Sequence, residues 1–180
     1  MALPRIGRKK QAESDPAGEY RKRREAMLRR LRKAGVPEAL LRDDPLPAGP
    51  VRKERAVFQS AAEQAFNAEL HLERILRKEE TFDTPLQRAA RLRALAVEAG
   101  RMGRGLEAWA DLLARPRAEL GSGEEARAAA IRSAPIPLWE GYVRLARHVR
   151  RVEARCDRAA RLAETRADVK RKKFAPSVKL

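Results

Sequence analysis

Residues 137–173, PLWEGYVRLARHVRRVEARCDRAARLAETRADVKRKK, determine the fold class of this protein, because they contain no proline or glycine after Gly141. At 100° per residue, small and apolar side chains fall on one face of this segment. This pattern predicts a helix of roughly 35 residues, about 50 Å long, which either packs against other helices or projects from the protein. The residues of the apolar face are Tyr142, Ala146, Val149, Val152, Cys156, Ala160 and Ala163.

A second stripe of this helix is formed by arginines, which recur every three or four residues roughly opposite the apolar face. One face therefore predicts packing against protein, and the other presents positive charge to a partner or to solvent. The arginines are Arg144, Arg147, Arg151, Arg155 and Arg158.

The remainder of the chain is also rich in helix-forming residues, mainly Ala, Leu, Arg and Glu. Aromatic residues make up only 4% of the 180 residues, and no alternating strand pattern exceeds four residues. We therefore predict an all-α fold with a modest, alanine-rich core. Binding to a partner or self-association would add stability to such a core.

Prolines and glycines divide the chain into four predicted segments. Residues 1–50 form a basic arm, with a disordered start, a short helix over 17–34 that ends at Gly35, and the linker DDPLPAGP at 43–50. Residues 51–116 form a neutral, long antiparallel helical hairpin, whose second helix starts after Asp83-Thr84 at Pro85. Residues 117–136 are a connector with a short helix, and residues 137–180 are the long basic amphipathic helix and a disordered basic tail.

Apolar residues at heptad-like spacing predict that the helices pack side by side, as in a coiled coil. Gly100, Gly103 and Gly105 interrupt the second hairpin helix, and they indicate either a close approach of two helices or a break near residues 100–105. The predicted packing residues are Phe58, Ala65, Leu72, Leu76, Trp109, Tyr142, Val149 and Cys156.

Net positive charge is confined to the two ends of the chain. The 41 basic and 25 acidic side chains give a net charge of +16. Residues 1–55 have 16 basic and 8 acidic groups (+8), residues 56–136 have 12 of each, and residues 137–180 have 13 and 5 (+8). Two basic ends around a neutral middle favour a polyanionic partner.

We therefore expect a non-catalytic nucleic-acid-binding subunit of a larger assembly, such as a ribosome-type particle or a DNA-packaging or nucleoid complex. Few aromatic residues accompany the basic clusters, so contacts to the phosphate backbone of DNA or RNA are favoured over base stacking. The predicted binding residues are Arg8, Lys9, Lys10, Arg21, Arg23, Arg24, Arg29, Arg30, Arg144, Arg147, Arg151, Arg155, Arg158, Lys170, Arg171, Lys172 and Lys173.

A second hypothesis is a helical adaptor or structural protein. In this case the apolar faces mediate oligomerisation or recruit partner helices, and the charge serves solubility. An anionic membrane surface is a third hypothesis, less favoured because the face opposite the arginines is mostly Ala and Val.

No residue pattern predicts an enzyme, a cofactor, a metal site or a small-molecule substrate. His148 and Cys156 lie on one helix, about 80° and about 12 Å apart, so they do not form a nucleophile–base pair. His71 has no second histidine at the spacing that holds a metal.

The single cysteine excludes an internal disulfide and favours a reducing intracellular compartment, the cytoplasm or the nucleoid. No run of 18 apolar residues predicts a membrane span. The start of the chain lacks the apolar region of a secretory signal, and an organelle stays open as a location.

Overall fold

The computed structural model describes residues 15–42, 49–114 and 122–174 of the protein, and these residues form an all-α fold without strands, as the sequence predicts. The disordered ends predicted for the chain and most of the 43–50 linker lie outside the described residues. The helices are α1 (Pro16–Lys33), α2 (Glu38–Leu41), α3 (Pro50–Leu76), α4 (Pro85–Ala114), α5 (Ser122–Arg132) and α6 (Leu138–Phe174).

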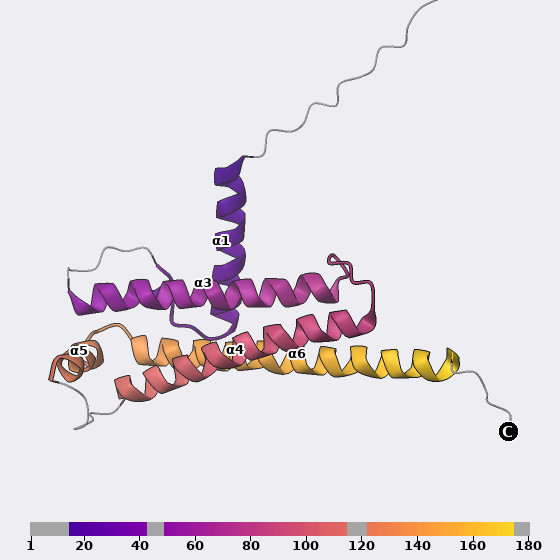
Figure 1. Ribbon diagram of the computed structural model, residues 1–180. Helices are drawn as coiled ribbons and strands as arrows, with labels where there is room; N and C mark the ends of the chain where they lie inside the picture. Colours follow the sequence, from indigo (N-terminus) through magenta and orange to yellow (C-terminus); the bar gives the residue numbers. More distant parts are fainter. Residues whose placement is uncertain (1–14, 43–48, 115–121, 175–180) are drawn as a thin grey trace, which may run out of the picture.

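The body of the protein consists of the three long helices α3, α4 and α6 (Figure 1). The turn at 77–84 reverses the chain, so that α3 and α4 run in opposite directions. The main packing partner of α4 is nevertheless α6 rather than α3. The basic C-terminal helix therefore does not project alone, because its apolar face closes one core with both hairpin helices.

Small residues let α4 and α6 approach closely. Gly100 and Gly103 are buried, and a Cβ at Gly103 would lie 2.8 Å from Cδ of Arg150 on α6. Since α4 is continuous from Pro85 to Ala114, the glycines do not break it. Of the two explanations for the three glycines, close approach holds at Gly100 and Gly103, whereas a Cβ at Gly105 would meet no described atom of another segment within 4 Å.

The helix ends follow local sequence signals. Gly35 adopts a φ of 84° after α1, and the hydrogen bonds from Val36 N to Leu31 O and from Gly35 N to Arg32 O form a Schellman motif. At the start of α4, Thr84 Oγ1 accepts from Gln87 N at 3.1 Å, and Gln87 Oε1 accepts from Thr84 N at 3.2 Å. This reciprocal capping box sets the entry to α4.

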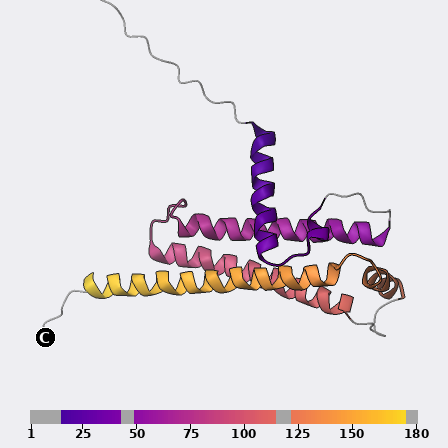
Figure 2. The same ribbon diagram turned by 180° about the vertical axis from the view of Figure 1, so that it is seen from behind.

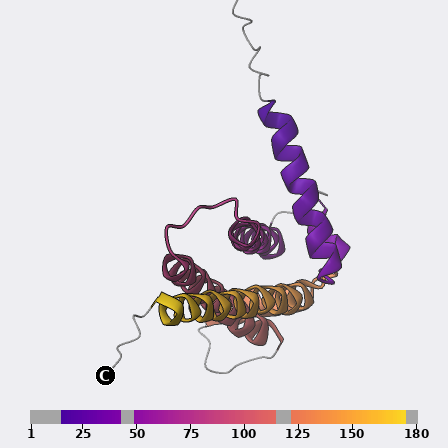
Figure 3. The same ribbon diagram turned by 90° about the vertical axis from the view of Figure 1, so that its right-hand side faces the viewer.

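Helix α1 stands away from the body at a steep angle (Figures 1 and 3). Only Leu31, near its C-terminal end, is buried, whereas the first turns are exposed on most sides. After the turn at Gly35, Val36 and the short helix α2 bring Leu40 and Leu41 into the core. The base of α1 is therefore anchored, and its N-terminal half projects from the body.

The structure places six of the eight predicted packing residues in the core: Phe58, Ala65, Leu72, Tyr142, Val149 and Cys156. Trp109 is partly buried against this core. The prediction for Leu76 is wrong, because its side chain is 39% exposed. The buried face of α3 continues from Leu72 to Ile75, one helical turn on, and α3 ends at Leu76.

Candidate nucleic-acid interface

The side of α6 that faces away from α3 and α4 carries three exposed arginines, Arg147, Arg151 and Arg158. They lie opposite Val149 and Cys156, which are buried in the core. None of the three forms an ion pair with a described residue. At 1.5 Å per residue they span about 16 Å along α6, which offers a row of fixed positive charge.

Helix α1 has a matching row. Lys22, Arg29 and Lys33 lie on the side opposite the buried Leu31, and all three are exposed. They also form no ion pair within the described part of the chain. The second row is therefore as open to a partner as the first.

The two helices that carry these rows lie on the same side of the molecule. Figure 2 shows α1 passing in front of α3 and α6 passing in front of α4. The turn after α1 also reaches α6, since a Cβ at Gly35 would lie 3.6 Å from Cδ of Arg144. We call the surface formed by Lys22, Arg29, Lys33, Arg147, Arg151 and Arg158 the basic face.

Four arginines of the predicted set form ion pairs within the protein, and one of them, Arg21, lies 4.0 Å from Asp15. Arg144 pairs with Glu140 at 3.3 Å, and Arg155 pairs with Glu69 at 3.2 Å. Arg30 lies 3.0 Å from Glu69 and 2.8 Å from Glu73. The structure therefore reduces the five-arginine stripe of α6 to three open side chains, and it assigns Arg30 to the attachment of α1.

Outside the basic face, the basic side chains of α4 and α6 have carboxylates near them. Arg150 pairs with Glu107 at 3.2 Å and with Glu153 at 2.7 Å, and Arg93 of α4 similarly pairs with two carboxylates of α6. The exposed arginines Arg91, Arg101 and Arg104 of α4 share their surface with the exposed acids Glu98 and Asp111. On α6, by contrast, no exposed acid lies between Arg147 and Arg158.

The other predicted binding residues have varied positions. Arg21 and Arg23 are exposed on the projecting half of α1, and Arg24, on the same half, is partly buried. Arg171 is exposed near the end of α6. Arg8, Lys9 and Lys10, and the side chains of Lys170, Lys172 and Lys173, lie outside the described residues.

Glu69 joins α1, α3 and α6 below the basic face. Its carboxylate contacts His148 Nε2 at 3.4 Å, Arg30 at 3.0 Å and Arg155 at 3.2 Å. The neighbouring His148 and then Arg30 lower the pKa of Glu69 to about 2, although burial acts in the opposite direction. An ionised Glu69 therefore fixes the base of α1 to both α3 and α6.

Sequence reasoning missed a second buried carboxylate, Glu54. This side chain is fully buried on α3, although its neighbours Lys53 and Arg55 suggest an ordinary charged surface. It accepts hydrogen bonds from Trp109 at 2.7 Å and Tyr142 at 2.6 Å. One sequence signal pointed to this burial: Glu54 precedes Phe58 by four residues, so both lie on the same face of α3.

The candidate catalytic groups remain apart. His71 is exposed on α3, and Cys156 is buried, which raises the pKa of its thiol to about 11. Within residues 15–42, 49–114 and 122–174, no three His, Cys, Asp or Glu side chains form a group that could hold a metal ion. In the same ranges, no helix combines the length and the apolarity that a membrane crossing requires.

Comparisons with protein-family models, with curated proteins and with solved structures found no match to this chain.

Proposed function

We propose that this protein is a non-catalytic nucleic-acid-binding subunit of a larger assembly, which binds the phosphate backbone through its basic face. The observation that carries the proposal is the distribution of ion pairs. Arg93, Arg150 and Arg155 pair with carboxylates of neighbouring helices, whereas the six cations of the basic face have no acidic partner among the described residues. A polyanion would supply the missing counter-charges.

Phosphate contacts suit these side chains. A nucleic acid that binds to the basic face releases the cations condensed on its phosphates, which makes its affinity depend steeply on salt. Arginine and lysine on two helices at a steep angle would contact phosphates in two directions, which favours a structured nucleic acid over an extended strand. This binding requires no particular base sequence.

The test is a binding titration of the full chain with a labelled blunt DNA duplex and with a structured RNA hairpin of similar charge. We expect binding to both at about 50 mM salt, and the logarithm of the association constant should fall linearly with the logarithm of the salt concentration. The relative affinity for DNA and RNA identifies the natural ligand class. If neither probe binds at about 50 mM salt, the proposal is wrong.

A second candidate function, that of a helical adaptor, is favoured by a partly apolar groove. This groove has a volume of about 660 Å³ between the 77–84 turn and the C-terminal half of α6. Phe82, Ala159 and Leu162 line it, and Leu162 is 57% exposed. A partner helix could bury these side chains. Light scattering that shows a defined oligomer, together with no response to either nucleic acid, would favour the adaptor.

A further inference from the structure

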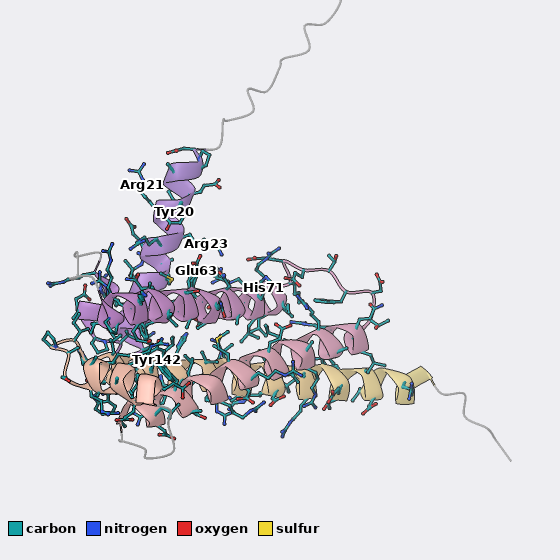
Figure 4. The ribbon with its side chains drawn as sticks, turned by 60° about the vertical axis from the view of Figure 1, so that its left-hand side comes forward. Tyr20, Arg21, Arg23, Glu63, His71 and Tyr142 are labelled. Atoms are coloured by element: carbon teal, nitrogen blue, oxygen red, sulfur yellow. The ribbon has the colours of Figure 1, made fainter. Side chains whose placement is uncertain are left out.

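A groove lies in the corner where the projecting helix α1 meets α3, and α2 closes one end. Its volume is about 370 Å³, within the range of pockets that take small ligands. The floor is apolar, with Met27 and Leu28 from α1 and Phe66 from α3. Figure 4 shows Tyr20, Arg23 and Glu63 around the same corner, and all three line the groove.

We propose that this groove, hereafter the arm groove, binds one unpaired nucleotide of the nucleic acid that occupies the basic face. The inference rests on the proposed function and adds a second type of contact to it. The base lies on the apolar floor beside Tyr20, its amino group donates to Glu63, and its phosphate contacts Arg23.

The wall formed by α1 provides the contacts for the ring and for the phosphate. The ring of Tyr20 is 61% exposed, so it presents an unused face on which a base can stack. Arg23 is exposed, and it donates to the neutral amide oxygen of Asn67 at 2.5 Å. That hydrogen bond orients the guanidinium and leaves its positive charge uncompensated.

Glu63 on α3 gives the arm groove a chemical preference. Its side chain is exposed and forms no ion pair with a described residue. An ionised carboxylate only accepts hydrogen bonds. It therefore favours bases with an exocyclic amino group, such as cytosine, over thymine, which presents a carbonyl oxygen at the same place.

A second copy of this chain fits the arm groove less well than a nucleotide does. Helix α1 contains eight basic and two acidic side chains, so the α1 helices of two copies would repel one another. The occupant must therefore combine negative charge with a flat or apolar part. A nucleotide has both, and it comes from the same molecule that the basic face would bind.

The experiment uses the full chain and three labelled DNA duplexes: one blunt, one with a three-nucleotide deoxycytidine overhang and one with a three-nucleotide deoxythymidine overhang. The two overhang probes have the same charge, so their affinity ratio removes the backbone contribution. We expect about tenfold tighter binding of the deoxycytidine probe. Glu63→Gln should bring this ratio close to one, because the amide both donates and accepts.

Matched variants separate the base contact from charge and from folding. Glu25→Gln changes the charge of an exposed carboxylate on α1 outside the arm groove, and it should leave the ratio unchanged. Tyr20→Ala should weaken both overhang probes several-fold, whereas Tyr20→Phe should retain stacking. Blunt-duplex affinity should be the same in the wild type and in both Tyr20 variants.

Equal affinity of the wild type for the two overhangs, or a ratio that survives Glu63→Gln, overturns the proposal. Salt-dependent binding of the blunt duplex would then still support the proposed function. An acidic, apolar peptide that binds with a requirement for Tyr20, while the overhangs bind equally, would also overturn it and would assign the arm groove to a protein partner.

Discussion

The hydroxyl of Tyr142 on α6 donates a hydrogen bond of 2.6 Å to Oε1 of Glu54 on α3, and both side chains are buried. Trp109 from α4 donates to the same oxygen at 2.7 Å, and Arg127 from α5 donates to Oε2 at 2.5 Å. Burial, and then the contact with Glu54, raises the pKa of Tyr142, so the hydroxyl keeps its proton. One carboxylate thus connects four helices.

Glu54→Gln should destabilise the protein by about 2–4 kcal/mol. The neutral amide removes the counter-charge of Arg127, and its single oxygen is a weaker hydrogen-bond acceptor for Trp109 and Tyr142. Urea unfolding followed by tryptophan fluorescence measures this change. Glu98→Gln, on the exposed side of α4, removes the same charge and should shift the free energy of unfolding by less than about 0.5 kcal/mol. Equal effects of the two substitutions would contradict a structural role of Glu54.

The ion-pair cluster at Glu69 predicts an acid-sensitive contribution to stability. The pKa of Glu69 is about 2 in the folded protein, below its ordinary value of 4.5, so ionised Glu69 stabilises the fold above about pH 4.5. This contribution is lost as the pH falls from 4.5 toward 2, and it is on the order of 3 kcal/mol. Glu69→Gln should therefore be less stable at pH 7 and should lose less stability between pH 4.5 and 2.

The measurement is the free energy of unfolding from urea titrations at several pH values. Glu63→Gln is the control, because Glu63 is an exposed carboxylate on the same helix without an ion pair to a described residue. This variant should follow the pH profile of the wild type. Parallel profiles for wild type and Glu69→Gln would show that the cluster with Arg30, His148 and Arg155 does not contribute.

Alanine substitutions at two glycines of the long helices should change the free energy of unfolding in opposite directions. A Cβ at Gly141 would meet the buried side chains of Leu40 and Phe58, the latter at 3.2 Å, so Gly141→Ala should destabilise by about 1–3 kcal/mol. Gly105 has open space, so Gly105→Ala should stabilise α4 by about 0.5–1 kcal/mol. Thermal unfolding of both variants measures the difference, and a stabilising Gly141→Ala would contradict the packing described for α2.

Cys156 should resist thiol reagents in the folded protein. Its side chain is buried, and burial raises its pKa to about 11, so the reactive thiolate is scarce at pH 8. We expect modification only at the rate at which the protein unfolds, and complete modification of one thiol in denaturant. Rapid modification under native conditions would show that the α4–α6 interface opens readily.

The basic face can be tested with two matched triple variants. Changing Arg147, Arg151 and Arg158 to Gln should reduce the slope of the logarithm of affinity against the logarithm of salt by up to about one for each arginine. The control variant changes Arg91, Arg101 and Arg104 of α4, which are also exposed, to Gln. It should leave most of the salt dependence intact. If both variants lose the same affinity, binding depends on net charge and not on the basic face.

The sequence predicted the all-α class well, because alanine, leucine, arginine and glutamate favour helices wherever proline and glycine are absent. It predicted the packing of Phe58 and Val149 from their spacing alone. It misplaced Leu76, because the spacing could not tell whether the core continues at residue 75 or at residue 76. The groove beside Tyr20 was also beyond prediction, since Phe66 comes from a distant segment of the chain.

The sequence by itself determined that positive charge is concentrated at the two ends of the chain and that one side of the last helix is basic, because charge and helical period are local properties. Only the tertiary structure decided which of those charges remain open. Glu69 is far from Arg30 and Arg155 in sequence, yet folding places its carboxylate against both and leaves Arg147, Arg151 and Arg158 unpaired among the described residues. Ion pairing acts across a few ångströms of space, and a linear sequence does not encode that distance directly.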